Sequence, residues 1–316
     1  MTQATEALAR LTGTRQASLL LAVSGGPDSM ALLDWLGRGW QGAVSAATVD
    51  HGLRPESAGE AAMVACYCDA AGIAHTTLQP AAPITGSLQS AARAARYALL
   101  EAHADAIGAQ FIVTAHHADD QLETVLMRLA RGGGVDGLAG IRARVGRVVR
   151  PLLGFRKADL LGHCQRAGIA FVEDPSNANR DFDRVRMREA LAGFDAIDPL
   201  KAARSALALA QAAEALDWIA AREADHAIII DETGVRLASS AFPPALLRRL
   251  VLRCIDQVQP GLQVRGPALD RLIETLQSGS QAMIGDMLCG QSRTDPGWHF
   301  GPAPPRHVAT GERAAE

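Results

Sequence analysis

The fold of this chain is decided by the stretch Ser18-Leu19-Leu20-Leu21-Ala22-Val23-Ser24-Gly25-Gly26-Pro27-Asp28-Ser29-Met30-Ala31-Leu32-Leu33. An apolar run that ends in two glycines and is followed by a second apolar segment is typical of a buried strand, a turn and a helix. Free N–H groups at a helix N-terminus attract anions, and the helix dipole adds to this attraction. The stretch therefore predicts a phosphate site at Ser24–Ser29, where Ser24 and Ser29 can donate hydroxyl hydrogen bonds. No lysine follows, so the loop is not of the Walker type.

The composition indicates a protein with a substantial core and no membrane segment. The chain has 316 residues, of which 48% are hydrophobic and 4% aromatic, enough for one α/β domain and a smaller second domain. Five cysteines are scattered without a C-x-x-C pair, which argues against disulfides and against zinc or iron–sulfur sites. Residues 1–16 carry no apolar signal segment, and no apolar run is long enough to span a bilayer. We expect a soluble, cytoplasmic protein with no membrane partner.

Short apolar runs alternate with helical patterns through the first part of the chain. Strands are predicted at 19–23, 43–49, 75–78 and 111–114, and helices near 27–38, 56–71, 87–107 and 118–130. This alternation is typical of an α/β fold with a doubly wound, mainly parallel sheet. Ligands of such sheets bind at the carboxyl ends of the strands. Polar clusters follow three of these strands, so we expect them to meet at one edge.

The character of the sequence changes near residue 195. Residues 1–195 are predicted to form the catalytic domain, with an irregular stretch from Gly132 to about Pro151. Residues 196–300 begin with an alanine-rich helical pattern over 201–224 and continue with a mixture of helices and short strands. They are predicted to form a smaller, mainly helical domain that binds the RNA substrate. Residues 301–316 are rich in proline, alanine and charge, and we expect them to be disordered.

Two motifs after the first helix supply further polar side chains. Asp50 and His51 follow the second predicted strand, where a charged turn is the alternative to a ligand contact. Arg93 and Arg96 are three residues apart in the helix near 87–107 and therefore share a face. An isolated pair of this kind is more often surface decoration than a functional site.

The segment Thr114–Thr124 places acidic residues at the same predicted edge. Asp119 and Asp120 fall in the first turn of a helix, where the dipole alone could explain them. Asp120 and Glu123 are three residues apart on one face, and such a pair can bind a magnesium ion, an ammonium group or both. His116 and His117 lack a third plausible ligand for zinc. His117 is expected to orient a neighbour or to contact a nucleotide.

The charge of the chain is unevenly distributed. The net charge is −3, yet residues 128–188 contain twelve arginines and one lysine against six acidic residues. Such a local surplus can lie on a nucleic-acid backbone. A solvated arginine-rich face is the alternative, because arginine outnumbers lysine by 29 to 2 in the whole chain.

Together these segments resemble the tRNA(Ile)-lysidine synthases, a family of PP-loop, N-type ATP pyrophosphatases. The matching segments are Ser24–Ser29, Val49–Arg54, Arg93–Tyr97, Thr114–Leu138, Arg150–Leu153, and Glu173–Asn177 followed by Arg184-Val185-Arg186. They cover residues 19 to about 192 in the order of the family. Beyond about residue 200 the resemblance is weak, which puts contacts of this part with the tRNA acceptor arm in doubt.

The resemblance implies an ATP-dependent ligation of free lysine to carbon 2 of the wobble cytidine in tRNA(Ile) with a CAU anticodon. ATP adenylates the base and releases diphosphate, and the ε-amine of lysine then displaces AMP, which switches codon reading from AUG to AUA. The implied partners are this tRNA, L-lysine and ATP with Mg²⁺. Whether the enzyme forms a homodimer is left open.

The resemblance also implies roles for individual residues. The implied catalytic residues are Asp28, Arg96, Asp120 and Glu123, with Arg96 on the transferring phosphate. ATP contacts are implied for Ser24, Gly25, Gly26, Pro27, Asp28, Ser29, Asp50, His51 and His117. Asp120 and Glu123 would bind lysine, and Asp28 and Asp120 are candidate Mg²⁺ ligands. The candidate tRNA contacts are Arg128, Arg131, Arg150, Arg184 and Arg186.

Two other functions are compatible with parts of this pattern. A PP-loop tRNA thiolase would activate a base with ATP and deliver sulfur, but the thiolases considered use paired C-x-x-C cysteines, whereas Cys66 and Cys68 would point to different faces of a helix. A non-catalytic nucleotide- or RNA-binding module could share the fold. Such a module would be expected to lack some of the acidic residues that are present here at 28, 119, 120 and 123.

Overall fold

The computed structural model describes residues 3–52, 56–81, 88–172, 183–232, 234–292 and 295–303. The chain divides into two compact units, Met1–Gln211 and Ala212–Glu316. This division falls inside one long helix, α9 (Pro199–Ala227), and therefore later than the predicted boundary between residues 195 and 196, which stays a prediction. The predicted turn at Glu173–Asn177 and residues Leu53 to Pro55 lie outside the described residues.

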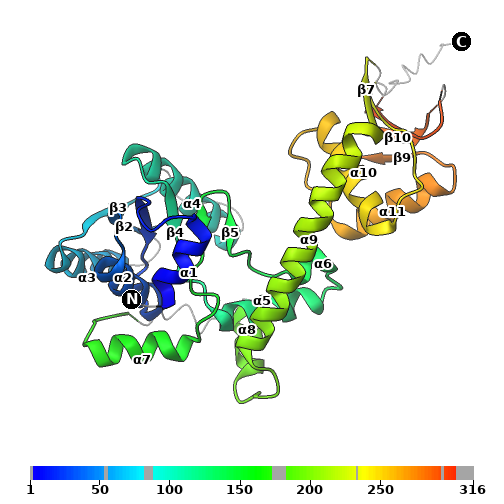
Figure 1. Ribbon diagram of the computed structural model, residues 1–316. Helices are drawn as coiled ribbons and strands as arrows, with labels where there is room; N and C mark the ends of the chain where they lie inside the picture. Colours follow the sequence, from blue (N-terminus) through cyan, green and yellow to red (C-terminus); the bar gives the residue numbers. More distant parts are fainter. Residues whose placement is uncertain are drawn as a thin grey trace, which may run out of the picture. The chain divides into compact units, whose positions relative to one another are not determined.

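The first unit is built on a mainly parallel sheet (Figure 1). Its strands are β1 (Leu19–Ala22), β2 (Val44–Val49), β3 (Ala74–Leu78), β4 (Phe111–Val113), β5 (Arg144–Val145) and β6 (Val148–Val149). Across the described part of this unit the strand order is β3-β2-β1-β4-β6-β5. Only the β5–β6 pair among these described strands is antiparallel. This confirms the predicted doubly wound, mainly parallel fold.

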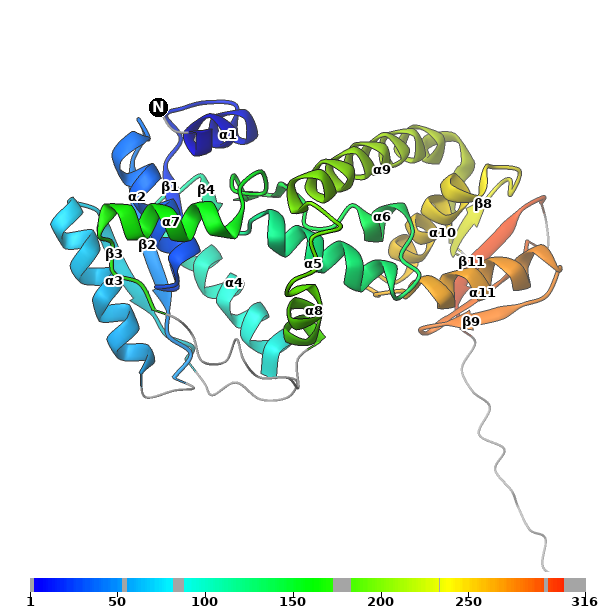
Figure 2. The same ribbon diagram turned by 90° about the horizontal axis from the view of Figure 1, so that it is seen from below.

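Helices cover both faces of this sheet because its central strands are apolar on both sides. The helices of the first unit are α1 (Gln3–Thr12), α2 (Pro27–Gly39), α3 (Ser57–Ala71), α4 (Leu88–Ala106), α5 (Ala118–Leu129), α6 (Val135–Leu138), α7 (Lys157–Ala167) and α8 (Asp183–Leu191). Leu19 and Leu21 pack in a core with α1, α2, α3 and α7, whereas Leu20 packs with Leu100 and Ala104 of α4. Figures 1 and 2 show these helices around the strands of the sheet. Alternation along β1 thus assigns one helical layer to each face.

The connection between α5 and α7 is more regular than the sequence predicts. The stretch from Gly132 to about Pro151, predicted to be irregular, contains α6 and the β5–β6 hairpin, and β6 pairs with β4. Such short strands carry too few residues to show a period of two. The order of the strands reverses between β1 and β4, so the segments that follow these two strands meet at the edge where doubly wound folds bind ligands.

The second unit contains helices and short strands, and these strands pair into one antiparallel sheet. Its helices, after the last part of α9, are α10 (Pro244–Val258) and α11 (Gly266–Gln277). In the described residues of this unit, antiparallel strands run in the order β7-β8-β11-β10-β9. These strands are β7 (Ile228–Asp231), β8 (Gly234–Leu237), β9 (Ala282–Ile284), β10 (Met287–Gln291) and β11 (Trp298–Pro302).

The core of the second unit joins the sheet to the helices. Leu250 and Cys254 of α10 and Leu276 of α11 pack with Cys289 and Phe300 of the strands. β11 extends to Pro302 and so includes the first two residues of the segment predicted from residue 301, whereas residues 304–316 lie outside the described residues. None of the helices among the described residues is both long and apolar enough to cross a membrane.

Candidate active site

The predicted phosphate loop lies between β1 and α2. Gly26 precedes the helix, Pro27 is its first residue, and Gly25 has a φ of 84°, a left-handed conformation that favours glycine. The Ser29 hydroxyl accepts a hydrogen bond from the Ser24 N–H at 3.2 Å and donates to the Gly26 carbonyl at 2.9 Å. The loop is thus braced by its own side chain, while Ser24 remains exposed. This geometry is suited to binding phosphate oxygens.

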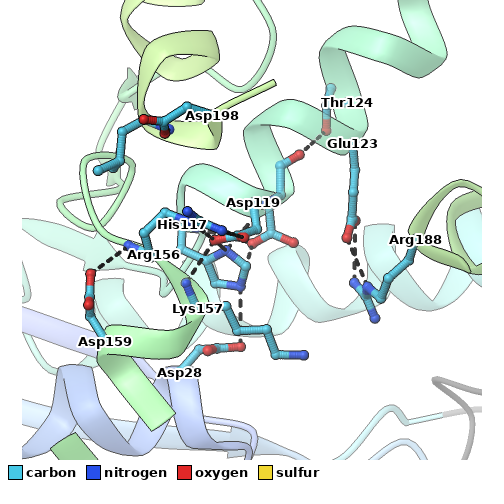
Figure 3. A network of polar contacts seen from close by, with 12 residues as sticks. Asp28, His117, Asp119, Glu123, Thr124, Arg156, Lys157, Asp159, Arg188 and Asp198 are labelled. Atoms are coloured by element: carbon cyan, nitrogen blue, oxygen red, sulfur yellow. Dashed lines mark hydrogen bonds and ion pairs between the residues drawn. The ribbon is translucent and has the colours of Figure 1, made fainter. Parts of the chain in front are cut away.

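Asp28 connects the phosphate loop to the start of α5. Its Oδ2 atom lies 3.5 Å from Nε2 of His117, which is buried (Figure 3). Its Oδ1 atom is also buried and has no hydrogen-bond partner among the described residues. An orphaned carboxylate oxygen is costly unless a cation or a donor satisfies it. Asp28 is therefore suited to hold a ligand that the protein alone does not supply.

His117 caps α5 and lies among carboxylates. Its Nδ1 accepts from the Asp120 N–H at 3.3 Å, and Asp120 Oδ2 accepts from the His117 N–H at 3.1 Å, which forms a capping box. Burial acts to lower the pKa of His117, but the nearby carboxylates of Asp28, Asp120 and Asp119 outweigh burial and raise this pKa above its ordinary value. His117 therefore orients Asp120 and contacts Asp28, in line with the predicted orienting role.

Asp120 and Glu123, named here the acidic pair, lie together on α5 and bind arginines of α8. Arg184 donates from Nη2 to Asp120 Oδ1 at 3.0 Å and from Nε to Glu123 Oε2 at 2.8 Å. Arg188 donates from Nε to Glu123 Oε1 at 2.8 Å (Figure 3). Glu123 is only 4% exposed. Arg184, predicted to contact tRNA, thus neutralises the acidic pair in this structure, and Arg188 was missed because its partner lies 65 residues away.

Asp119 faces a different element from the acidic pair. It accepts from Arg156 Nη2 at 3.1 Å and from the Lys157 N–H at 2.8 Å (Figure 3). Burial acts to raise the pKa of Asp119, but Arg156 and the Lys157 N–H outweigh burial, so this pKa lies below its ordinary value. Asp119 therefore stays charged and fixes the start of α7 against α5.

Asp50 is held by groups of its own neighbourhood. Its carboxylate is buried and accepts from the Ser57 hydroxyl at 2.6 Å, the Gly52 N–H at 2.9 Å and Gln79 Nε2 at 3.2 Å. These bonds, with the Ser57 hydroxyl first, lower the pKa of Asp50. The adjacent His51 has a buried Nδ1 without a hydrogen-bond partner among the described residues. Of the two predicted ATP contacts after β2, His51 therefore has the freer polar group.

Three arginines lie around Tyr97 of α4. They are Arg93 and Arg96 of the same helix and Arg150, which was predicted as a tRNA contact. The guanidinium carbons of Arg93 and Arg96 lie 5.1 Å and 5.4 Å from the centre of the Tyr97 ring. Arg150, which follows β6 and is 7% exposed, lies with Nη2 3.5 Å from the Tyr97 hydroxyl. We name Arg93, Arg96 and Arg150 the arginine cluster.

The other predicted tRNA contacts differ in their surroundings. Arg128 donates to the carbonyls of Gly137 and Gly140, at 2.8 Å and 3.0 Å, so it holds α6 and the turn after it against α5. Arg131 and Arg186 are exposed to a larger extent and both form an ion pair with Asp183. The turn that Arg128 stabilises could not be anticipated from its position in a basic segment.

Among the described residues, no group of three or more His, Cys, Asp or Glu side chains is placed to hold a metal ion. The cysteines are free: Cys66 is exposed, whereas Cys68, Cys164, Cys254 and Cys289 are buried. Burial raises the pKa of the Cys68 thiol to about 11, so Cys66 and Cys68 do not form a pair of accessible thiolates.

Comparisons with known proteins agree with this geometry. The PP-loop domain family matches residues 1–193. The tRNA(Ile)-lysidine synthase of Zymomonas mobilis is 42% identical over 308 residues, which cover 95% of this chain and 92% of the relative. That of Novosphingobium aromaticivorans is 43% identical over 296 residues, which cover 90% of this chain and 88% of the relative.

A solved structure supports the fold independently of sequence. The U34-tRNA thiolase NcsA from Methanococcus maripaludis, with its 4Fe-4S cluster, superposes with a TM-score of 0.53. The match covers 65% of this chain and 76% of the thiolase, at 14% sequence identity. At this identity the likeness concerns the fold alone.

Proposed function

Because this chain belongs to the tRNA(Ile)-lysidine synthase family, we propose that it joins free lysine to carbon 2 of the wobble cytidine of CAU-anticodon tRNA(Ile) at the expense of ATP. The observation that carries this proposal is the acidic pair beside the phosphate loop, bridged to it by His117. The pair already binds two guanidinium groups, which supports its use as a seat for the ammonium group of lysine. The product would read AUA in place of AUG.

The first step of the proposed reaction uses the phosphate loop and Arg96. The oxygen of the base forms a bond to the α-phosphorus of ATP, and the bond from that phosphorus to diphosphate breaks. The free N–H groups of the loop and the Ser24 hydroxyl would hold the phosphate oxygens, while the Ser29 hydroxyl, which donates to the Gly26 carbonyl, keeps the loop in shape. Arg96 would stabilise the charge that develops on the transferred phosphate. Groups that are already oriented in this way lower the barrier without reorganising.

The second step uses the acidic pair. The ε-ammonium group of lysine first gives one proton to water, and its lone pair then bonds to carbon 2 of the cytidine. The bond between that carbon and the oxygen carried by AMP breaks, and the nitrogen passes a second proton to water. Asp120 and Glu123 would orient the amine through charge-assisted hydrogen bonds. His117 would keep Asp120 in place through the capping box at the start of α5.

Magnesium fits one of the two predicted ligands. The buried, unpartnered Oδ1 of Asp28 is an oxygen donor of the kind that Mg²⁺ prefers, so Asp28 would hold the ion. Both oxygens of Asp120 already accept hydrogen bonds, from Arg184 and from the His117 N–H, so Asp120 fits the ion poorly in this arrangement. When bound, Mg²⁺ would neutralise charge on the phosphates.

The remaining parts of the proposal concern the tRNA contacts, the roles of the two domains and the cellular compartment. Of the candidate tRNA contacts in the arginine-rich segment, Arg131 and Arg186 would be better exposed to RNA than Arg128. The catalytic domain of residues 1–195, the tRNA-binding role of residues 196–300 and a homodimer remain predictions. The cytoplasm is the compartment in which we expect the enzyme to meet its tRNA.

The test is incorporation of radiolabelled lysine into an unmodified CAU-anticodon tRNA(Ile) transcript in the presence of ATP and magnesium. We expect label in this transcript with the wild-type protein, none in a methionine tRNA and none with Asp28→Ala. Absence of label with a folded, ATP-binding wild-type protein would contradict the proposal. A sulfur donor added to the same reaction would then separate a thiolase from a binding module.

A further inference from the structure

Tyr97 gathers three guanidinium groups from two separate segments of the first unit. Arg93 and Arg96 approach its ring from one turn of α4, whereas Arg150 reaches its hydroxyl from the residue after β6. Arg150 is also held by the Arg142 carbonyl, which accepts from its Nη1 at 2.9 Å. The arginine cluster is therefore built by the tertiary fold and is more than a helical repeat of basic residues.

The positive charge of this cluster is not compensated by the described part of the chain. Within the described ranges, no carboxylate forms an ion pair with Arg93, Arg96 or Arg150. Arg147, close by in the sequence, is different because it pairs with Glu101 and Asp105. Like charges repel at short range, so an anion bound between these guanidinium groups would relieve their repulsion.

Buried donors in the same region also lack partners. The Nε atoms of Arg96 and Arg150 are buried without a hydrogen-bond acceptor among the described residues. Buried donors of this kind are usually satisfied in native proteins, by protein, water or ligand. These orphaned donors mark a place where acceptor oxygens are missing.

The positive charge of the arginine cluster also shifts the pKa values of His116 and Tyr97. Burial, followed by the charges of Arg150, Arg96 and Arg93, lowers the pKa of His116 well below its ordinary value. Burial acts to raise the pKa of Tyr97, but Arg150 and Arg93 outweigh it and lower this pKa. His116 is held to the Thr114 hydroxyl at 2.9 Å and stays neutral, so it adds no charge to the cluster.

We propose that Arg93, Arg96 and Arg150 form a seat for a phosphate-type anion, with Tyr97 as the side chain that holds the three guanidinium groups together. This inference deepens the proposed function, on which it rests, by adding Arg93 and Arg150 to the role implied for Arg96. Guanidinium forks match the spacing of phosphate oxygens and bind them with two parallel hydrogen bonds. The same chemistry is offered by the diphosphate that leaves ATP and by a phosphodiester of the RNA.

The experiment is calorimetric titration of the full chain with inorganic pyrophosphate and, separately, with a short single-stranded RNA. Arg93→Gln and Arg150→Gln should each weaken binding of at least one probe by about tenfold. The control is Arg147→Gln, which removes a neighbouring arginine that has its own carboxylates, and it should change binding by less than about twofold. Arg93 is exposed, so Arg93→Gln remains informative if Arg150→Gln lowers stability.

Each outcome has a defined meaning. Loss confined to pyrophosphate identifies a diphosphate seat, and loss confined to RNA identifies a phosphodiester seat; both support the inference. Wild-type affinity of Arg93→Gln and of folded Arg150→Gln for both probes overturns it. If lysine incorporation fails while the arginine variants still lose anion binding, the proposed reaction is wrong and the seat stands.

Discussion

The acidic pair and the arginine cluster lie at the same edge of one sheet but differ in how their charge is balanced. Asp120 and Glu123 have guanidinium partners at 2.8 Å to 3.0 Å, so a cationic substrate has to replace or share a partner. Arg93, Arg96 and Arg150 have no carboxylate partner in the described residues, so an anion adds new interactions. If lysine binds at the acidic pair as proposed, it has to displace or share these arginines, whereas a phosphate at the arginine cluster displaces no protein carboxylate.

The largest expected effect concerns the arginine cluster, whose positive charge has no carboxylate partner in the described residues. Arg96→Gln should lower kcat of lysine incorporation by roughly 100- to 1,000-fold, because it removes a donor aimed at charge that develops in the transition state. The KM for ATP should change much less. Steady-state rates would be compared with Arg147→Gln, whose charge is compensated and whose kcat should stay close to that of the wild type. A kcat for Arg96→Gln within tenfold of the wild type would remove Arg96 from the chemistry.

The next largest effect concerns the acidic pair, whose negative charge is neutralised by arginines of α8. Glu123→Gln keeps the shape of the side chain but removes the charge, so the KM for lysine should rise by roughly 100-fold, equivalent to about 3 kcal/mol. The KM for ATP should rise far less, since the phosphate loop is unaltered. Lysine and ATP titrations would be run beside Glu214→Gln, which changes an exposed carboxylate on α9. An unchanged lysine dependence would mean that Glu123 only anchors α8.

The two sides also differ in how far the sequence could predict them. The phosphate loop and the shared face of Asp120 and Glu123 follow from local spacing, and the structure places both as expected. The arginines that neutralise the pair lie more than 60 residues further along the chain, so no local pattern reveals them. Both arginines belong to α8, whose basic motif is equally compatible with RNA binding. Of the two, the sequence therefore predicts a role only for Arg184, and that role is a contact with tRNA.

The same limit applies to Arg128 and to β6. Arg128 belongs to a basic run, but its partners are two backbone carbonyls. Every residue has a backbone carbonyl, so no sequence pattern predicts which of them an arginine contacts. β6 has only two residues, too few for a periodic pattern, yet it positions Arg150 directly behind it. Long-range contacts and very short strands are therefore the parts of this site that required the tertiary structure.

A smaller effect tests whether the arginines of α8 compete with lysine. Arg188 donates two hydrogen bonds to Glu123, so Arg188→Gln should lower the KM for lysine by roughly fivefold, because a blocked site reduces apparent affinity by the fraction that is open. Lysine would be titrated at saturating ATP and tRNA. A higher KM for lysine would instead show that Arg188 holds Glu123 in its productive position, and the contrast between the two sides would lose its functional meaning.

The smallest effect separates arginines that are free to meet RNA from those used by the fold. Arg131 is exposed and pairs with Asp183, which also pairs with Arg186, so Arg131→Gln should change the free energy of unfolding by less than about 1 kcal/mol. It should weaken tRNA binding modestly and reduce the slope of log K against log salt by about one.

Arg128→Gln should instead affect stability more than RNA binding. It should lower the free energy of unfolding by about 1–3 kcal/mol, because two carbonyls lose their donor. Filter binding across salt concentrations and urea unfolding of both variants would measure this, and an unchanged salt slope for Arg131→Gln would show that its charge serves Asp183 alone.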